Sequence, residues 1–448
     1  MALTGIQIFK MLPKTNCGEC GVPTCLAFAM NLAAGKAELD ACPYVSEEAR
    51  ASLSEASAPP IRPISFGTGD NLVKVGGETV LFRHEKTFVN KPGIAILVSD
   101  TMGADEIDGR LRRFLELKYE WVGLTLHAES LAVKNESGDG AKFASLVAKI
   151  KEKTAASLIL ISDNPQALAA ALKAAGEGSS LIYAATEANY EAFANLAKEF
   201  KCPLALKAAD LESLAALSDK VTALGVKDLV LDAGSRTLRR AFEDQTNIRR
   251  AALLQKNRSL GFPTIVFPGE MTQDPLKETL IAATFVAKYG GIIVLSDFQG
   301  ETLFPLLLAR LNIYTDPQRP MTMKQDIYPI GNPTADSPAL ITTNFALTYF
   351  IVSGEIDASR VPSWLLVMDT EGLSVLTAWA AGKFVGDAIG LFVKKSGLAE
   401  RITHRRIIIP GAVALVSGDL EEELGADWEV KIGPREAAHL PAYLKINM

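Results

Sequence analysis

A pattern of strands and helices that repeats from residue 93 to about residue 320 constrains this fold more than any other feature. Each unit is a short apolar run, a turn residue and a helical segment with apolar residues three and four positions apart. Runs that are apolar on both faces and joined by helices require parallel pairing, and eight such units suit a closed (β/α)8 (TIM) barrel. A doubly wound open sheet is the alternative. The runs are GIAILVSD, EWVGLTL, SLILISD, SLIYAAT, PLALKAA, DLVLDAG, TIVFPGE and GIIVLSD.

Acidic residues follow the carboxyl ends of several of these strands. Catalytic groups of a (β/α)8 barrel lie at that end, so the pattern indicates a candidate active site. Acidic residues in this position also cap the following helices, and that structural role is the more common one. The candidate positions are Asp100, Asp163, Asp232, Glu270 and Asp297.

A second region of alternating strands and helices follows the proline-rich stretch at 314–338. It contains the strand runs SWLLVMDT and RRIIIPG and a long helical segment, GLSVLTAWAAGKFVGDAIGLFVKKSG. The pattern predicts a three-layer α/β domain of Rossmann-like or flavodoxin-like type, in which ligands bind at the carboxyl ends of the strands. Glycines in the loops there either leave room for a ligand or only make tight turns. These loops are 342–344, 368–374, 409–413 and 432–436.

Four of the five cysteines lie in one stretch near the N-terminus, with the spacing C-x2-C-x4-C-x16-C. Zinc ribbons usually use the C-x2-C spacing twice, whereas three close cysteines and a distant fourth before a proline are typical of [4Fe-4S] clusters. We therefore expect an iron-sulfur cluster, with structural zinc or a disulfide as the alternatives. The fifth cysteine, Cys202, is expected to be a small buried hydrophobe. The four clustered residues are Cys17, Cys20, Cys25 and Cys42.

The segment between the cysteines and the barrel predicts a tether. The sequence SLSEASAPPIRPIS, at 52–65, has no apolar periodicity, and a proline-rich chain is extended. Two short alternating runs, NLVKVGG and TVLFRH, then predict a β-hairpin. The expected domains are an iron-sulfur module at 1–57, a linker and hairpin at 58–92, the barrel at 93–320 and the α/β domain at 321–448.

Composition argues against several classes of function. The chain has 46 Lys and Arg residues, 52 Asp and Glu residues and a net charge of −6, without the basic stripe of a nucleic-acid-binding protein. It has no signal-peptide pattern and no run that could span a membrane, so we expect a cytoplasmic protein without a membrane partner. P-loop, G-x-G-x-x-G, G-x-S-x-G and H-E-x-x-H motifs are missing, which leaves hydride transfer and conventional hydrolysis without support.

The order of these parts resembles a known family. The cluster sequence CGECGVPTC, the barrel, and a C-terminal block with LITTNFALTYF, MDTEGLSVLTAWAAGKF and IPGAVALVSGDLEEELG are the features that carry the resemblance. Together they are similar to the large (gamma) subunit of the corrinoid iron-sulfur protein of the reductive acetyl-CoA (Wood-Ljungdahl) pathway. The resemblance extends over the whole chain. The CGECG motif occurs in other electron-transfer proteins, so the C-terminal block is the specific part.

This resemblance implies a methyl-group carrier rather than a stand-alone enzyme. In this family a corrinoid cobalt accepts a methyl group from methyltetrahydrofolate through a methyltransferase and delivers it to acetyl-CoA synthase. The [4Fe-4S] cluster reactivates Co(II) to Co(I). The implied partners are a small subunit that forms a heterodimer with this chain, the methyltetrahydrofolate methyltransferase, and CO dehydrogenase/acetyl-CoA synthase.

The resemblance also implies which residues hold the two cofactors. The cluster ligands would be the four cysteines of the N-terminal stretch, and the corrinoid (a cobamide) would lie on the C-terminal domain. Its contacts would come from Thr342, Thr343, Asn344, Ala346, Thr370, Glu371, Gly372, Leu373, Ser374, Gly411 and Gly433.

The histidines bear on the state of the cobalt. Many corrinoid proteins carry a D-x-H-x-x-G sequence whose histidine binds the cobalt from below, and no histidine of this chain is followed by glycine three positions later. We therefore expect a base-off corrinoid without a protein ligand, which favours Co(I) because that ion has a filled axial orbital. Two other functions stay open on the sequence: a barrel enzyme that uses the cluster as an electron source, and an electron-transfer adaptor.

Overall fold

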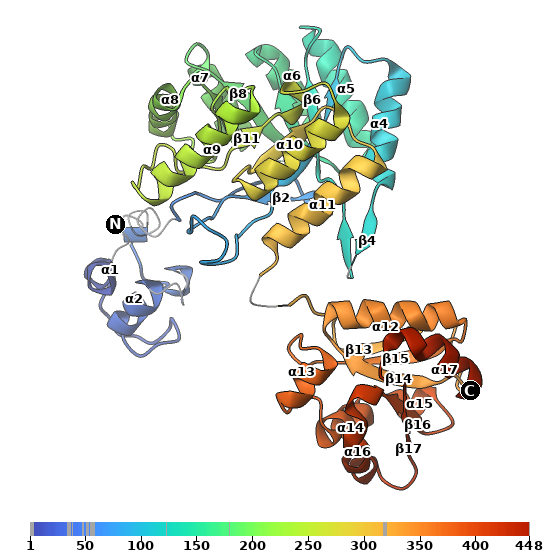
Figure 1. The fold of residues 1–448 in the computed structure, drawn as a ribbon. Coiled ribbons are helices and arrows are strands. Elements are labelled where there is room, and N and C mark those ends of the chain that lie inside the picture. Colours follow the sequence, from blue (N-terminus) through green and yellow to red (C-terminus); the bar gives the residue numbers. More distant parts are fainter. Residues whose placement is uncertain are drawn as a thin grey trace. The chain divides into compact units, whose positions relative to one another are not determined.

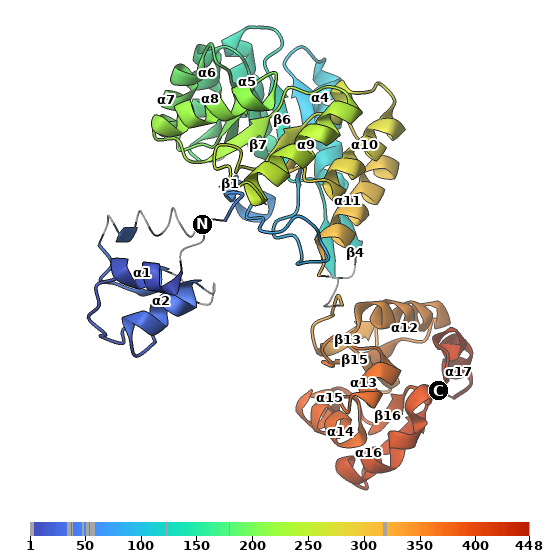
Figure 2. The same ribbon diagram turned by 60° about the vertical axis from the view of Figure 1, so that its left-hand side comes forward.

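The chain divides into two compact units, Met1–Lys118 with His127–Tyr314, and Tyr119–Leu126 with Thr315–Met448 (Figures 1 and 2). Of the expected linker, residues 52 and 54–58 lie outside the described part of the chain. No helix in that part is both long enough and apolar enough to cross a membrane. The computed structural model describes residues 4–33, 37, 39–46, 49–50, 53, 59–121, 123–178, 180–316 and 320–447.

The first unit is built on a closed barrel of eight parallel strands. The strand order is β10-β9-β8-β7-β6-β3-β12-β11, and a parallel bridge between Leu231 and Thr264 joins the two ends of this order. The sheet therefore closes on itself, which confirms the (β/α)8 barrel over the open sheet. The strands are β3 (Gly93–Ser99), β6 (Ser130–Lys134), β7 (Ser157–Ile161), β8 (Ser180–Ala185), β9 (Leu204–Lys207), β10 (Leu229–Asp232), β11 (Ile265–Val266) and β12 (Ile292–Leu295).

The prediction is wrong for one of the eight strands. The run EWVGLTL forms a separate antiparallel hairpin of β4 (Tyr119–Trp121) and β5 (Leu124–Leu126), and Gly123 takes a φ of +71° between them. The barrel position belongs to β6, whose sequence is SLAVK and which pairs with β3 and β7. The reason is burial: the middle three residues of β6 are completely buried, as a barrel strand requires, whereas most of the hairpin is exposed.

Helices surround the barrel, and side-chain caps begin four of them (Figure 1). Asp139, Asn164, Asp210 and Asp274 each accept hydrogen bonds from backbone N–H groups of the first helical turn, as their place before the apolar periodic segments indicates. The helices are α4 (Ala104–Glu116), α5 (Gly140–Lys153), α6 (Pro165–Ala175), α7 (Tyr190–Phe200), α8 (Leu211–Ala223), α9 (Leu238–Leu253), η3 (Pro268–Glu270), α10 (Pro275–Ala287) and α11 (Gly300–Tyr314).

A small hairpin closes the amino-terminal end of the barrel. Its strands β1 (Ile64–Phe66) and β2 (Val73–Val75) are antiparallel and are connected through the short 3-10 helix η2 (Gly69–Asn71). The apolar side chains of the hairpin join one buried cluster with side chains from all eight barrel strands. The last two residues of the predicted tether, Ile64 and Ser65, therefore belong to a strand that packs on the barrel core.

The predicted pairing of NLVKVGG with TVLFRH is wrong. Residues 79–84 form no strand, and β2 pairs with β1 instead. The backbone carbonyl oxygen of Val80 accepts hydrogen bonds from Arg249, and that of Leu81 accepts one from the Tyr289 hydroxyl. Side chains of the barrel thus take the place that a neighbouring strand would occupy.

A buried ion pair holds α11 against the barrel. The side chain of Arg310 is 2% exposed and lies 2.8 Å from a carboxylate oxygen of Glu129. The same guanidinium donates to the carbonyl oxygens of Pro92 at 2.8 Å and His127 at 3.0 Å. Burial by itself would raise the pKa of Glu129, but Arg310 and Lys91 outweigh it and lower that pKa to about 2.

The second unit contains a three-layer α/β domain. Its strand order is β13-β15-β14-β16-β17, and only the edge strand β13 is antiparallel to its neighbour. The expected Rossmann-like or flavodoxin-like architecture is confirmed. The elements are β13 (Asp326–Ile330), β14 (Ala339–Thr343), α12 (Ala346–Ser359), β15 (Ser363–Met368), α13 (Val375–Ala380), α14 (Gly386–Lys395), α15 (Leu398–Arg401), β16 (Arg406–Ile409), η4 (Gly411–Val416), α16 (Ser417–Leu424), β17 (Glu429–Ile432), η5 (Ala437–His439) and α17 (Leu440–Asn447).

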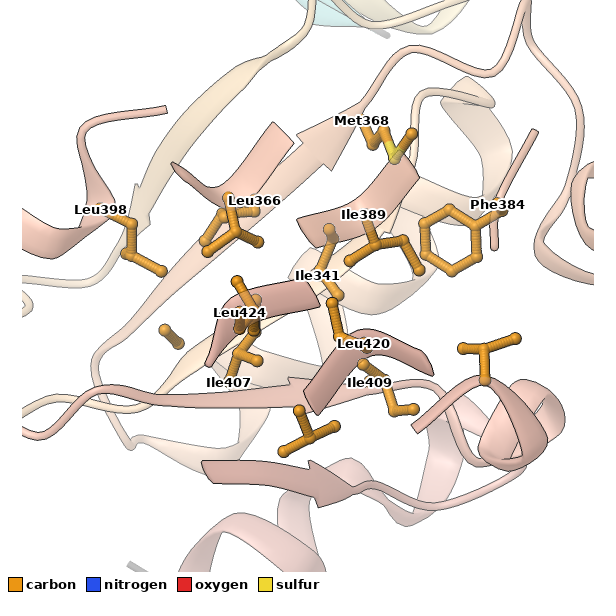
Figure 3. Close-up of a cluster of buried hydrophobic side chains, with 14 of the residues drawn as sticks. Ile341, Leu366, Met368, Phe384, Ile389, Leu398, Ile407, Ile409, Leu420 and Leu424 are labelled. Atoms are coloured by element: carbon orange, nitrogen blue, oxygen red, sulfur yellow. The ribbon is translucent and has the colours of Figure 1, made fainter. Parts of the chain in front are cut away.

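Two apolar cores hold the sheet between its helical layers. One core packs the sheet against α12 and α17. The other packs the opposite face against α13, α14 and α16, and Figure 3 shows its side chains, among them Ile341, Leu366 and Leu420. Because both faces of the strands are buried, the ends of the strands are the part of the sheet open to a ligand.

The single helix expected from 372 to 397 is interrupted. α13 ends at Ala380 and α14 begins at Gly386. Between them Gly382 takes a φ of +71°, and the N–H of Lys383 bonds back to the carbonyl oxygen of Ala378. Glycine in this conformation ends helices, so the alanine-rich sequence cannot continue as one helix.

Candidate functional site

The carboxyl edge of the five-stranded sheet contains a topological switch point. β14 comes before β15 and β16 in the sequence and lies between them in the sheet. The helix that follows β14 packs on one face, and the helices that follow β15 pack on the other. The loops therefore separate between β14 and β16, and α/β sheets of this kind bind their ligands in that crevice.

An apolar cavity of about 140 Å³ lies at this switch point. β14 and β16 supply its floor, and Thr348 and Val352 of α12 form one wall. Among the lining residues only Arg435 carries a charge. The other lining residues are Leu340, Ile341, Thr342, Val375, Ile408, Ile409, Pro410, Ala412, Gly433, Pro434, Ala437 and Leu440.

Two threonines at the end of β14 have hydroxyl groups that find no hydrogen-bond partner among the described residues. Thr342 is 1% exposed and Thr343 is completely buried. Successive side chains of a strand point to opposite faces of the sheet, so the two hydroxyls lie against different helical layers. A buried hydroxyl without a partner costs about 1–3 kcal/mol, which a hydrogen-bonding ligand in the cavity beside Thr342 would offset.

Two glycines allow the ends of β16 and β17 to approach each other closely. A Cβ atom at Gly411 would lie 2.3 Å from the carbonyl oxygen of Gly433. The N–H of Gly411 donates to the carbonyl of Pro434 at 3.1 Å, and that of Gly433 donates to Ile409 at 2.9 Å. Backbone packing is thus sufficient reason for both glycines, and Gly433 also lines the cavity.

An open groove with a volume of about 910 Å³ forms a second hollow at the end of β14. One wall is the segment 320–325 before β13, and the other is the loop after β15 with Asp369, Glu371 and Leu373. Asn344 lies between the two walls. The end of β14 therefore contributes to both hollows.

The structure divides the expected corrinoid contacts into three groups. Thr342 and Gly433 line the cavity, while Asn344, Glu371 and Leu373 line the groove. The others line neither hollow, and most of them are buried or bonded within the loops, so their contact with a ligand stays a prediction. This third group comprises Thr343, Ala346, Thr370, Gly372, Ser374 and Gly411.

Sequence reasoning missed the helical and C-terminal lining of the cavity. Thr348 and Val352 are four residues apart on α12, so they lie on one face of that helix. Pro410 and Arg435 belong to the loops after β16 and β17, which the sequence analysis did single out as strand ends. The sequence therefore indicates that the two residues share a face of α12, but whether that face lies toward the cavity depends on how the helix packs.

The N-terminal cysteines lie in a small helical module. Its elements are α1 (Gly5–Met11), α2 (Cys25–Ala33) and η1 (Leu39–Ala41). Cys20, Cys25 and Cys42 all pack in its apolar cluster, and Cys17 is exposed on the loop before α2. Among the described residues, no three His, Cys, Asp or Glu side chains are gathered in a metal-binding arrangement.

The chemistry of the cysteine loop nevertheless fits an iron-sulfur cluster. All five cysteines of the chain are free thiols, and thiolates are the ligands of such clusters. Gly18 and Gly21 take positive φ values of 78° and 84°, so the chain folds back tightly between the cysteines. The N–H of Asn16 points at the sulfur of Cys25 at 3.4 Å, the kind of contact that tunes a cluster.

The acidic residues at the mouth of the barrel are engaged within the protein. Buried Asp232 accepts a hydrogen bond from the Tyr183 hydroxyl at 2.5 Å and pairs with Arg236, which also pairs with Glu270. Burial and the neighbouring Asp232 raise the pKa of the Tyr183 phenol. These contacts favour a structural role over a catalytic one.

The other strand-end carboxylates give the same result with one exception. Asp100 is 2% exposed and accepts hydrogen bonds from the N–H groups of Glu136 and Ser137, which belong to the loop after the next strand. Asp297 binds Arg113 with both carboxylate oxygens. Only Asp163 is exposed without such a contact in the described structure.

Two family models match this chain, one over the cysteine segment and one over most of the remaining residues. The family model described as CO dehydrogenase/acetyl-CoA synthase delta subunit (CdhD) matches residues 63–444. The model described as a putative Fe-S cluster (FeS) matches residues 12–44, which contain the four clustered cysteines.

Curated relatives match the chain over its full length. The corrinoid/iron-sulfur protein large subunit of Moorella thermoacetica is 47% identical over 448 residues, which is 100% of both chains. The acetyl-CoA decarbonylase/synthase complex subunit gamma of Methanopyrus kandleri is 36% identical over 99% of this chain and 97% of its own. The subunit of that name from Methanothermobacter thermautotrophicus is 34% identical over 99% of each.

Among solved structures, dihydropteroate synthase from Thermus thermophilus aligns with a TM-score of 0.39 at 14% identity, over 56% of this chain and 100% of that one. The barrel of this chain is defined by its own strand pairings.

Proposed function

Because this chain belongs to the family that contains the corrinoid/iron-sulfur protein large subunit and the acetyl-CoA decarbonylase/synthase gamma subunits, we propose that it carries a methyl group on a bound corrinoid. When bound, the corrinoid would supply a cobalt able to carry methyl from methyltetrahydrofolate, by way of a methyltransferase, to acetyl-CoA synthase, and a [4Fe-4S] cluster would supply the electron that reactivates Co(II) to Co(I). The chain's own residues hold, orient and shield these groups.

The observation that carries the proposal is the pair of hollows at the end of β14. The cavity of about 140 Å³ is close to the size that holds one benzene-sized group, so a corrin ring cannot enter it. The larger groove offers the open surface that a flat macrocycle needs. We infer that the corrinoid lies across the carboxyl edge of the sheet and places only a smaller apolar part in the cavity.

The lining of both hollows supports a corrinoid without a protein ligand on its cobalt. No histidine lines either of them in the described part of the chain. His404 lies at the other end of the sheet, where its ring is 3.0 Å from the carbonyl oxygen of Ser337 before β14. We therefore propose, as the sequence suggests, that the corrinoid is bound base-off.

The cluster ligands are proposed to be the four N-terminal cysteines. Cys25 and Cys42 are buried in the module, Cys20 is partly buried, and Cys17 lies on the exposed loop. Folding this loop around a cluster would bring Cys17 inward, since metal binding and local folding are coupled. Tyr44, which directly follows the Cys42-Pro43 pair, already bonds to Glu19 of the loop at 2.8 Å.

The carboxyl edge of the sheet also fits a partner protein. Leu347, Leu376 and Leu415 are between 54% and 67% exposed, and each lies in the first turn or two after a strand end. Exposed leucines gathered around a binding site are typical of a surface that another protein covers. We propose the small subunit for this role, and the methyltransferase and CO dehydrogenase/acetyl-CoA synthase as exchanging partners.

Metal analysis of the anaerobically purified complex tests the proposal. A carrier should contain cobalt and cluster in equal amounts, with corrinoid absorption bands that change on addition of a low-potential reductant. About four irons per complex with no cobalt would refute it. Asp163→Asn and Glu270→Gln should leave methyl transfer unchanged, whereas both would lower turnover in an enzyme that works at the barrel mouth.

A further inference from the structure

We propose that Asn344 is a positioning residue, which sets the width of the groove for the corrinoid through its bonds to both walls. This inference rests on the proposed function for the identity of the ligand. The role of Asn344 itself follows from its burial, its hydrogen bonds and the conformation of the loop that it holds.

The side chain of Asn344 is buried and bonds to the loop after β15 through both of its polar atoms. The residue is 4% exposed. Its amide oxygen accepts the N–H groups of Thr370 and Gly372, both at 3.0 Å, and the Thr370 hydroxyl at 3.2 Å. Its amide nitrogen donates to Asp369 at 2.8 Å. The amide oxygen is thus fully occupied by the loop, and one N–H of the amide nitrogen is bonded to Asp369.

The backbone of Asn344 is engaged as well, and it connects the two walls of the groove. Its N–H donates to the carbonyl of Met368 at 2.8 Å, just before the loop that forms one wall. Its carbonyl oxygen accepts the N–H of Met323 at 2.9 Å, in the segment that forms the other wall. One residue therefore holds both walls at fixed distances from the end of β14.

The loop that Asn344 holds contains two successive residues in the left-handed region of the backbone. Glu371 and Gly372 both take positive φ values, 57° and 76°, and a non-glycine residue rarely does so. The loop also packs tightly, because a Cβ at Gly372 would lie 2.8 Å from a methyl group of Thr322 in the opposite wall. Releasing the amide of Asn344 should therefore change the loop and the width of the groove together.

Only an amide side chain satisfies both requirements of this position. It must accept three hydrogen bonds on one atom and donate to a carboxylate on the other. Asn344→Asp keeps the shape and the acceptor but places a second carboxylate 2.8 Å from Asp369. The repulsion should open the loop, and a proton shared between the two carboxylates should restore the bond at low pH.

The pH dependence of the Asn344→Asp variant also depends on the charged groups around residues 344 and 369. Asp369 and Glu371 belong to the loop, Lys383 pairs with Glu371, and Lys324 lies in the opposite wall. No histidine lines the groove in the described residues.

The test is titration of the full chain, in its purified complex and free of corrinoid, with hydroxocobalamin at pH 8 and at pH 5.5. Asn344→Asp should lower the affinity at least tenfold at pH 8, with most of the loss recovered at pH 5.5. Hydrogen exchange over 369–374 should speed up in parallel. Asp369→Asn in the same chain should restore a donor and an acceptor and recover the affinity at pH 8.

Asn189→Asp is the matched control, because the same change at a barrel turn should alter neither affinity nor exchange in 369–374. Equal affinity of the wild type and Asn344→Asp at pH 8, or a loss that is the same at both pH values, would overturn the positioning role. Failure of the wild-type complex itself to bind hydroxocobalamin would instead overturn the proposed function.

Discussion

Thr342 has a buried hydroxyl without a partner among the described residues, and this gives opposite predictions for stability and for binding. Thr342→Val should raise the free energy of unfolding by about 1 kcal/mol, because an unpaired polar group leaves the interior. It should weaken hydroxocobalamin binding if the ligand bonds to that hydroxyl. Urea unfolding and absorbance titration measure the two effects.

Thr154→Val is the control for this prediction. Thr154 is also buried, but its hydroxyl donates to the carbonyl oxygen of Ile150 at 3.0 Å, so the same change should cost about 1 kcal/mol. Equal destabilisation by the two substitutions would show that the Thr342 hydroxyl already has a partner.

The Arg310–Glu129 pair predicts a large effect of one substitution. Arg310→Met leaves Glu129 buried beside a single remaining cation, and we expect a loss of about 3–5 kcal/mol in the unfolding free energy of the barrel. Arg239→Ala should cost well under 1 kcal/mol, because Arg239 pairs with Glu243 at the surface with 90% of its side chain exposed. Urea titrations followed by tryptophan fluorescence would compare the two.

The same pair predicts how stability depends on pH. Folding lowers the pKa of Glu129 from its usual value near 4.3 to about 2, so the contribution is complete above pH 4.3 and is lost as the pH falls toward 2. Glu129→Gln should flatten the decline of the unfolding free energy across that window. An unchanged slope would show that other carboxylates cause it.

At the residue scale, a sequence predicts a candidate site when the residues of that site recur at a recognisable spacing along the chain. The cysteines and the loops at the strand ends follow from spacing along the chain. Val352 and Leu440 do not, because their place in the cavity lining depends on how α12 and α17 pack on the sheet. Asn344 was found by position, but its role depends on three segments that are distant in sequence.

At the scale of elements, the β1–β2 hairpin predicts where the barrel is most sensitive to a cavity. Phe66 is 1% exposed and packs among the inward side chains of the barrel strands. Phe66→Ala should cost about 3–5 kcal/mol in the thermal or urea transition of the barrel and leave corrinoid binding unchanged. Phe82→Ala should cost far less, because Phe82 is 47% exposed. Similar losses for both would mean that the hairpin does not close the core.

The elements also show where alternation of apolar residues misleads. EWVGLTL and TVLFRH alternate well enough for strands, yet one is a hairpin outside the barrel and the other pairs with side chains. SLAVK is shorter and was passed over, although its small buried residues suit a barrel interior. Alternation of apolar and polar residues indicates a local preference for a strand. Which segment then pairs with a neighbouring strand depends on the packing of the whole domain.

At the scale of the whole molecule, separate cores predict that the two cofactors can be lost separately. Cys42→Ser removes a buried thiol from the module, so iron content should fall to near zero while cobalt content stays unchanged. Cys202→Ser should leave both metals unchanged, because Cys202 is buried in the barrel unit. Anaerobic metal analysis gives the result, and joint loss of cobalt and iron would contradict independent binding.

Each region of the chain has its own sequence pattern, and the predicted division rests on these patterns. Cysteine spacing, the barrel repeat and the second α/β pattern each follow from short segments. Closure of the barrel depends on the bridge between Leu231 and Thr264. The sequence around either residue does not by itself reveal this bridge.

The pairing of β3 with β12 has a consequence for synthesis. β3 leaves the ribosome long before its partner, so one of its edges has no strand to bind until Leu295 has been made. The apolar side chains of the β1–β2 hairpin likewise remain uncovered until the barrel strands that pack against them have been made. The need for a chaperone should therefore be greatest while the middle of the chain is being translated. The C-terminal α/β domain is made last, after all the strands of the barrel.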